Sequence, residues 1–79
     1  MKKVTIYSTP TCFYCHAAKD FFAENNIAYE EHNVAADTKA REEMFAKSHQ
    51  MGVPVIDVDG EIIVGFDKKM LTDLLVPVK

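Results

Sequence analysis

Cys12 and Cys15, the two cysteines of the chain, are separated by two residues and lie between a Val/Ile-rich strand pattern and an amphipathic helical pattern. The first turn of a helix has unpaired backbone N–H groups and the positive end of the macrodipole, and both stabilise a thiolate. Thiols in such Cys-x-x-Cys pairs commonly titrate at roughly 3.5 to 7, against about 8.5 for a free thiol. We therefore expect a redox-active pair in which Cys12 is largely ionised at neutral pH.

Length and charge limit the class of protein that can contain this cysteine pair. The chain has 79 residues, of which 48% are hydrophobic, and a net charge of -3 from 9 basic and 12 acidic residues. This length predicts a single domain over residues 1–79, and the absence of a basic run predicts no nucleic-acid partner. Residues 1–7 lack the apolar core of a signal peptide, and no apolar stretch approaches the ~18 residues of a membrane span. We expect a cytoplasmic protein with no membrane contact, in which the two thiols pair reversibly.

The first half of the chain predicts a strand, a helix and a second strand. Alternation from Lys3 to Tyr7 predicts the first strand, and a loop over residues 8–11 then leads to Cys12. The helix that follows has an apolar stripe of Tyr14, Ala17, Ala18, Phe21 and Phe22, and Asn25 and Asn26 end it. Residues 28–34 predict the second strand, which its charged residues place at a sheet edge.

The second half predicts a helix, a hairpin and a last helix. Asp37 and Thr38 cap the first of these helices, Gly52 ends it, and Glu43 and Lys47 have the spacing of an ion pair. Its expected inner face consists of Ala40, Met44, Phe45 and Met51. Two antiparallel strands follow at residues 54–58 and 61–64, joined by an Asp59-Gly60 turn. The last helix starts at residues 65–67, buries Met70, Leu71, Leu74 and Leu75, and stops at Pro77, which completes the order βαβαββα.

Four motifs in this order carry a family resemblance over essentially the whole chain. They are Cys12-Phe13-Tyr14-Cys15-His16, Arg41-Glu42-Glu43-Met44, Val53-Pro54 and Val64-Gly65. Together they resemble the glutaredoxin branch of the thioredoxin fold. The resemblance implies an α/β fold with a four-stranded mixed sheet in the order 2-1-3-4, flanked by three helices.

The two cysteines have distinct expected roles in catalysis. Cys12, at the exposed helix start, attacks a substrate disulfide, and Cys15, one turn further in and buried, resolves the mixed disulfide. Val53-Pro54 looks like the family's cis-proline turn, whose Val53 backbone groups would bind an extended thiol peptide. Tyr14 is expected either in the core or at the border of the substrate groove. The expected groove residues are Thr11, Phe13, Tyr14, Val53, Pro54, Gly65, Phe66 and Asp67.

The resemblance implies a monomeric thiol–disulfide oxidoreductase with no tightly bound cofactor, which reduces protein or glutathione mixed disulfides with electrons from glutathione. Three departures bear on that donor. Phe13 replaces the common Pro, Thr9 stands where many members have Lys, and Gly65-Phe66-Asp67-Lys68 replaces Gly-Gly-x-Asp. Two charged positions that bind glutathione in the family pattern are therefore altered. The Gly-Phe pair resembles instead the small glutaredoxin-like proteins that reduce ribonucleotide reductase and draw electrons from a thioredoxin-reductase-type flavoprotein, which is the alternative donor.

The same two thiols fit other kinds of chemistry less well. Cys12-x-x-Cys15-His16 also matches a c-type haem attachment signature, but an export signal is missing and the helical stripe is needed to pack on a sheet. A zinc site with His32 or His49 as fourth ligand would lack the usual second pair of closely spaced ligands, so no metal site is expected. An iron-sulfur cluster bridged by Cys12 and glutathione has no positive support in the sequence. A non-catalytic metal or cluster carrier is the alternative class.

Overall fold

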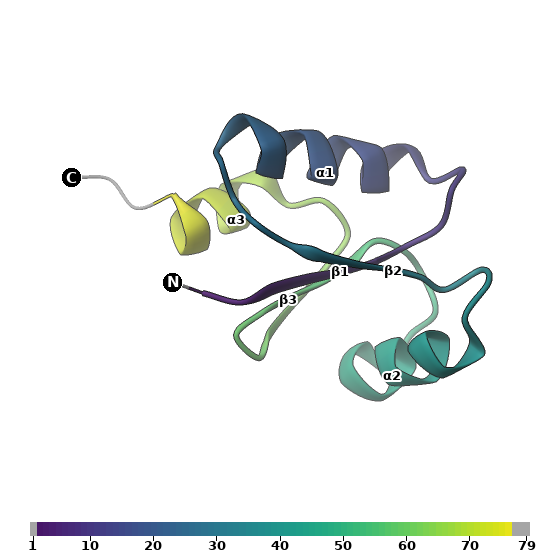
Figure 1. The fold of residues 1–79 in the computed structure, drawn as a ribbon. Coiled ribbons are helices and arrows are strands. Elements are labelled where there is room, and N and C mark those ends of the chain that lie inside the picture. Colours follow the sequence, from purple (N-terminus) through teal and green to yellow (C-terminus); the bar gives the residue numbers. More distant parts are fainter. Residues whose placement is uncertain (1, 77–79) are drawn as a thin grey trace.

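The computed structural model describes residues 2–76, and its elements follow the predicted order βαβαββα (Figure 1). The strands are β1 (Val4–Ser8), β2 (Glu30–Asn33), β3 (Val55–Val58) and β4 (Glu61–Val64). The helices are α1 (Phe13–Glu24), α2 (Thr38–Ser48) and α3 (Lys68–Leu75). Asn25 caps the C-terminus of α1, as the sequence predicts.

The four strands form one mixed sheet in the order β2-β1-β3-β4, which confirms the expected order 2-1-3-4. β2 runs parallel to β1, whereas β3 runs antiparallel to both β1 and β4. Asp59 and Gly60 join β3 to β4 with φ values of 51° and 94°, as a two-residue hairpin turn requires. The predicted hairpin is therefore confirmed.

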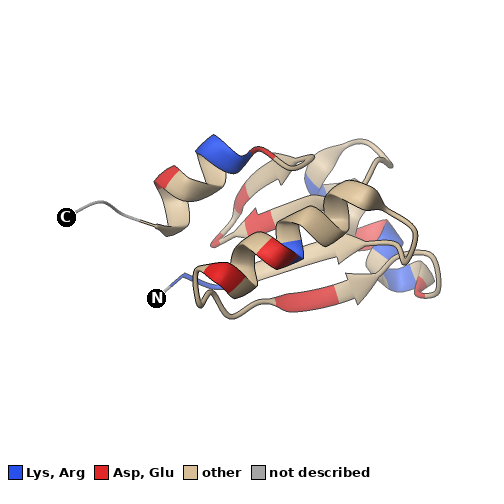
Figure 2. Cartoon of the chain, turned by 90° about the horizontal axis from the view of Figure 1, so that it is seen from above, with Lys and Arg blue, Asp and Glu red and all other residues tan. Residues whose placement is uncertain are grey.

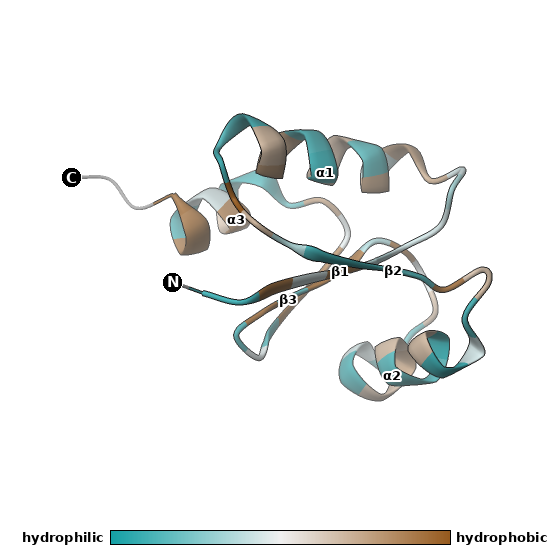
Figure 3. Ribbon diagram, in the orientation of Figure 1, coloured by the Kyte–Doolittle hydropathy of each residue, from teal (hydrophilic) through white to brown (hydrophobic). Residues whose placement is uncertain are grey.

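The sheet is covered on both faces, by α1 and α3 on one and by α2 on the other (Figure 1). All five residues of β1 are buried, because this central strand has strand neighbours on both sides and helices on both faces. Figure 3 shows the contrast between the hydrophobic colouring along β1 and β3 and the hydrophilic colouring of β2. β2 lies at the sheet edge with Glu30 and Glu31 exposed, as predicted (Figure 2).

α2 begins as predicted but ends early. The Asp37 side chain caps it by accepting a hydrogen bond from the Ala40 N–H at 3.1 Å. The helix stops at Ser48, before Gly52, because His49 takes a left-handed conformation with φ 61°. Met51 therefore leaves the helical repeat and is 52% exposed, so its predicted burial is wrong.

Phe45 is also exposed, at 49%, although the sequence predicted it on the inner face of α2. It follows the fully buried Met44 directly, and successive helical residues are rotated by about 100°. Ala40 and Met44 alone form the buried stripe of α2. Phe45 points away from the sheet because only residues at the i, i+4 spacing of Ala40 and Met44 face it.

The predicted Glu43–Lys47 ion pair is wrong, because residues of the sheet provide better partners. Lys47 Nζ lies 2.7 Å from Asp57 Oδ2 and donates to the Tyr7 hydroxyl at 2.8 Å, and that hydroxyl donates to Glu43 Oε1 at 2.8 Å. Burial raises the pKa of Tyr7. Burial opposes the charge of Lys47, but the hydrogen bonds to Asp57 and Tyr7 outweigh it and raise its pKa above the usual value. This network joins α2 to β1 and β3.

α3 begins at its N-cap Asp67, whose side chain accepts a hydrogen bond from the Met70 N–H at 3.1 Å. Leu71 is fully buried and Leu74 and Leu75 pack partly buried on the core, as expected. Met70 is 41% exposed, so its predicted burial is wrong; it precedes Leu71 and is rotated away from the sheet. Pro77, the predicted stop, lies outside the described residues. Within residues 2–76, no helix is long and apolar enough to span a membrane.

Candidate active site

Cys12 is the N-cap residue of α1. Its backbone is extended, with φ -84° and ψ 114°, and its Sγ accepts a hydrogen bond from the Cys15 N–H at 3.1 Å. The sulfur thus takes the place of the side-chain oxygen that usually caps a helix. No acidic residue lies in the first turn of α1 to oppose a negative charge. The helix start therefore favours an anionic sulfur at Cys12.

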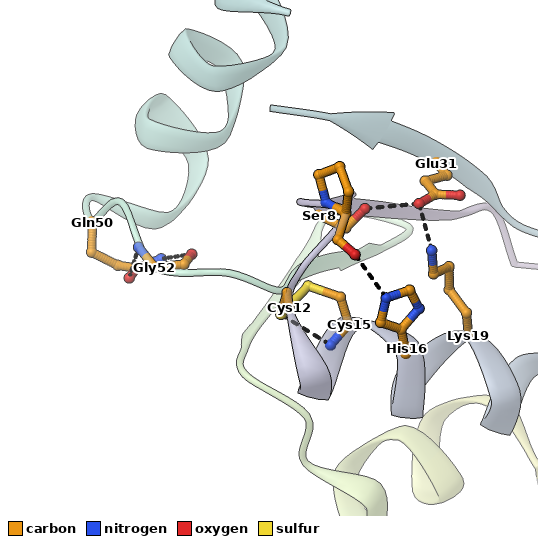
Figure 4. The surroundings of a disulfide bond; sticks show 9 residues. Ser8, Cys12, Cys15, His16, Lys19, Glu31, Gln50 and Gly52 are labelled. Atoms are coloured by element: carbon orange, nitrogen blue, oxygen red, sulfur yellow. Dashed lines mark hydrogen bonds and ion pairs between the residues drawn. A yellow bond between two sulfur atoms is a disulfide. The ribbon is translucent and has the colours of Figure 1, made fainter. Parts of the chain in front are cut away.

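The structure is the oxidised form, with a disulfide between Cys12 and Cys15 and a Cα–Cα distance of 5.2 Å (Figure 4). Cys15 is fully buried, as the sequence predicts for the second thiol, whereas Cys12 is partly exposed. A disulfide or thiol arriving from solvent can reach Cys12 and cannot reach Cys15. The difference in exposure gives the two sulfurs different access to substrate.

The loop before Cys12 is held against α1 by His16. The Nε2–H group of His16 donates to the Pro10 carbonyl at 2.9 Å (Figure 4). The Cys12 N–H donates to the Thr9 carbonyl at 3.3 Å, so the loop closes as a turn just before the helix. Thr11, expected in the groove, is an exposed residue of this turn. His16 therefore belongs to the framework of the site, because it ties the loop to α1.

Two aromatic side chains stand exposed next to Cys12. Phe13 is 76% exposed and Tyr14 is 60% exposed, and their rings meet edge-on at a centroid distance of 5.3 Å. Of the two roles expected for Tyr14, a place in the core is wrong, since the buried face of α1 consists of Cys15, Ala18, Phe21 and Phe22. The start of α1 therefore carries an apolar surface beside the reactive sulfur.

A charged cluster lies beneath the loop, and the sequence does not predict it. Lys19 Nζ lies 2.7 Å from Glu31 Oε2, and the buried Ser8 hydroxyl donates to the same oxygen at 2.9 Å (Figure 4). The hydrogen bonds from Lys19 and Ser8 hold the pKa of Glu31 below its usual range. The cluster joins α1, β1 and β2 where the loop to Cys12 begins. Its members are too far apart in the chain to give a local signal.

The Val53-Pro54 bond is cis, as the resemblance implied. The Pro54 carbonyl accepts a hydrogen bond from the Gly65 N–H at 2.8 Å, so the structure brings these two expected groove residues together. Val53 is half-buried, and in the described part of the chain its backbone N–H and carbonyl make no hydrogen bond. The preceding residues Gln50 and Gly52 lie in the surroundings of the disulfide (Figure 4).

The remaining expected groove residues lie at and just before the N-cap of α3. Phe66 is partly buried in the core and packs on Phe21 at a ring-centroid distance of 6.1 Å. Asp67 uses Oδ1 to cap α3, and Lys68 follows as an exposed residue. The start of α3 therefore offers one free carboxylate oxygen and a lysine.

The model of the Glutaredoxin family matches residues 4–63. The chain belongs to the glutaredoxin family. A glutaredoxin-like 8.6 kDa protein of a Clostridium pasteurianum rubredoxin operon is 50% identical over 72 residues, which cover 91% of this chain and 96% of that protein. Glutaredoxin 3 of Escherichia coli K12 is 36% identical over 67 residues, covering 85% and 81%. With its Cys-x-x-Cys motif, this glutaredoxin-family protein is a thiol–disulfide oxidoreductase.

Solved structures agree with the glutaredoxin assignment and show the thioredoxin-like fold. The structure of a thioredoxin-like protein matches with a TM-score of 0.88 at 37% identity, covering 96% of this chain and 97% of that one. NrdH-redoxin from Escherichia coli, a glutaredoxin-like protein with a thioredoxin-like activity profile, matches with a TM-score of 0.84 at 27% identity, covering 98% and 99%. Among the described residues, no group of three or more His, Cys, Asp or Glu side chains could hold a metal ion.

Proposed function

We propose that this protein reduces disulfides of other proteins, and mixed disulfides with glutathione, in two exchange steps. The Cys12 thiolate attacks one substrate sulfur, forms a mixed disulfide and releases the other substrate sulfur as a thiolate. The Cys15 thiolate then attacks Cys12 Sγ, which releases the second substrate thiolate. Two electrons pass to the substrate, and the protein ends with the Cys12–Cys15 disulfide.

One observation carries this assignment of roles. Cys12 is partly exposed at the N-cap of α1 and accepts the Cys15 N–H, whereas Cys15 is fully buried one turn further in. An attacking thiol must be both ionised and accessible, and a resolving thiol needs access only to its neighbour. We propose that Thr11, Phe13 and Tyr14 border the groove on one side and that Val53, Pro54, Gly65, Phe66 and Asp67 border it on the other.

We propose glutathione as the electron donor, acting as co-substrate without any tightly bound cofactor. The free backbone groups of Val53 suit the cysteinyl part of a thiol peptide, because a strand-like pair of hydrogen bonds needs an unpaired N–H and carbonyl. The second carboxylate oxygen of Asp67 can accept from an ammonium group. Two glutathione molecules would return the disulfide to the dithiol.

A thioredoxin-reductase-type flavoprotein is the second candidate donor, and three observations favour it. Lys68 and the inward-packed Phe66 weaken the site for the γ-glutamyl end of glutathione, and Phe13 and Tyr14 offer an exposed apolar surface of the kind that a protein partner covers. The match to NrdH-redoxin, a glutaredoxin-like protein with a thioredoxin-like activity profile, points the same way. In either case we propose a monomer acting in the cytoplasm.

The experiment that separates the donors measures NADPH oxidation with insulin as substrate. One arm contains glutathione and glutathione reductase, the other thioredoxin reductase, and Cys12→Ser is the blank in both. Activity that exceeds the blank only with glutathione supports the first candidate; activity only with thioredoxin reductase supports the second. Activity in neither arm overturns the proposed reductase.

The same sample tests the rival class, a metal or iron-sulfur carrier. A colourless, metal-free preparation that reduces insulin at full rate is the outcome expected of a reductase. Loss of all reductase activity on removal of a bound metal or cluster would instead favour the carrier.

A further inference from the structure

The side-chain amide of Gln50 lies against the loop that leads to Val53. Gln50 Oε1 accepts a hydrogen bond from the Gly52 N–H at 2.7 Å, and Gln50 Nε2 donates to the Gly52 carbonyl at 3.1 Å. The same Nε2 donates to Ser48 Oγ at 3.2 Å, and that hydroxyl donates to the Met44 carbonyl of α2 at 2.8 Å. One amide thus ties both backbone groups of Gly52 to the end of α2.

Gly52 is matched to this amide. A Cβ atom at position 52 would lie 2.7 Å from Gln50 Oε1, a distance that real Cβ atoms essentially never show. Gly60 and Gly65 have positive φ values, and Gly52 does not. The backbone conformation therefore does not require glycine at position 52, but the Gln50 amide can keep its place only while position 52 has no Cβ, and a larger residue there would push the amide aside.

Gln50 and Gly52 lie just before Val53, whose backbone N–H and carbonyl are not hydrogen-bonded within residues 2–76. Gln50 and Gly52 lie in the surroundings of the disulfide (Figure 4), and Val53 follows Gly52 in the chain. On the other side, Pro54 is held by the hydrogen bond from Gly65, and Val53 packs on the cluster around Tyr7 and Met44. With Gly52 held by the amide, both neighbours of Val53 are fixed.

We propose that Gln50 and Gly52 form an interlocked pair that positions the Val53 backbone for the main chain of a polypeptide substrate. Gln50 is then a positioning residue, and it discriminates between peptide disulfides, which have main-chain amides to pair with Val53, and small disulfides, which have none. The inference rests on the proposed function, because it needs substrate bound beside Cys12. It adds a determinant of substrate class that is separate from the thiols.

The test uses the pre-reduced full chain in single-turnover reactions, which need no electron donor. Gln50→Met, Gly52→Ala and the double variant are each mixed with a disulfide-linked peptide dimer and, separately, with hydroxyethyl disulfide. We expect the half-saturating concentration of the peptide dimer to rise about tenfold, as for the loss of a hydrogen bond worth about 1.4 kcal/mol, with an unchanged maximal rate. The rate with hydroxyethyl disulfide should not change.

The double variant is the matched control, because Gly52→Ala alone already displaces the amide. Its half-saturating concentration should equal that of either single variant. Additive losses, equal losses for both substrates, or no loss for the peptide would each overturn the positioning role. Gln50→Glu, which keeps the acceptor for Gly52 N–H and loses the donors, should fall between wild type and Gln50→Met. Failure of the proposed function has a different signature, namely a wild type that reacts with neither disulfide.

Discussion

At the scale of single residues, the site depends on where each sulfur and charge lies relative to a helix terminus. Cys12 caps α1 and Cys15 donates its N–H to the Cys12 sulfur, so one residue supplies both a buried thiol and a backbone donor. At the start of α3, by contrast, Lys68 places a positive charge beside Asp67. The first helix start favours an anion, whereas the second combines charges of both signs.

Lys68→Asp should therefore improve the use of glutathione. The substitution replaces a charge that repels the γ-glutamyl ammonium group with one that attracts it, and exposed charge contacts are worth about 0.2 to 1 kcal/mol. We expect the KM for glutathione to fall by roughly 1.4- to 5-fold at low salt. Lys69→Asp, with the same change of net charge one residue further on, is the control. Equal KM values for the two variants would mean that Lys68 has no specific place near glutathione.

At this scale the sequence predicts short-range chemistry well. The Cys-x-x-Cys pair, its place at a helix start and the burial of Cys15 follow from neighbours within four residues. Gln50 was not predicted, because its contact with Gly52 exists only where α2 ends at Ser48, and the αL residue His49 that ends it is not a glycine. Phe66 packs inward because Phe21 offers it a partner, which no local pattern shows.

At the scale of elements, the packing of α2 on the sheet depends on polar as well as apolar contacts. Only Ala40 and Met44 are buried in α2, and the network of Lys47 with Asp57 and Tyr7 supplies the remaining tie to β1 and β3. Tyr7 is fully buried, and its hydroxyl has Lys47 and Glu43 as its hydrogen-bond partners. The packing of α2 on the sheet is therefore sensitive to the loss of one charged side chain.

Lys47→Met should lower the free energy of unfolding by about 1 to 3 kcal/mol, because Asp57 and the Tyr7 hydroxyl lose their partner in a partly dehydrated place. Lys69→Met is the matched control, since Lys69 and Asp73 form an ion pair 3.4 Å apart with both side chains largely exposed. That change should cost less than about 0.5 kcal/mol. Urea unfolding of both variants checks the prediction, and equal losses would contradict it.

Asp57 should make the fold sensitive to acid. Burial opposes its charge, but hydrogen bonds from Lys47 and the Gly60 N–H outweigh this and hold its pKa below the usual 3.8. A carboxyl with a lowered pKa in the folded state stabilises fully above its unfolded pKa, and this stability is lost as the pH falls through the folded value. Between pH 5 and pH 2, Asp57→Asn should therefore lose less free energy of unfolding than the wild type. Parallel losses in urea titrations would show that Asp57 does not titrate differently in the two states.

At the scale of the whole molecule, two hydrophobic clusters lie on opposite faces of one sheet and share its central strands. Ile6 and Ile56 point to the cluster under α1 and α3, whereas Tyr7 and Val55 point to the cluster over α2. The element order, the sheet order and the hairpin were all predictable, because they follow from periodicity, turn residues and the family motifs. Which residues of α2 are buried was not predictable, since its apolar stripe is narrow and polar contacts with the sheet replace apolar ones.

Because the clusters share β1 and β3, residues 1–79 should unfold as one cooperative unit. Far-UV circular dichroism, which reports on the helices, and tyrosine fluorescence, which includes the buried Tyr7, should give coincident urea transitions. Separate midpoints for the two signals would show that α2 and its cluster unfold independently of the rest.

The central claim is that Cys12 attacks substrate and Cys15 resolves the product, and intact-protein mass spectrometry tests it most directly. Reduced Cys15→Ser and Cys12→Ser variants are each mixed with a disulfide-linked peptide, and the covalent adduct is measured. The exposed sulfur at the N-cap of α1 should give a stable mixed disulfide in Cys15→Ser, whereas the buried sulfur in Cys12→Ser should give almost none. An adduct that accumulates on Cys15 in the Cys12→Ser variant, as fast as or faster than on Cys12, would contradict the account.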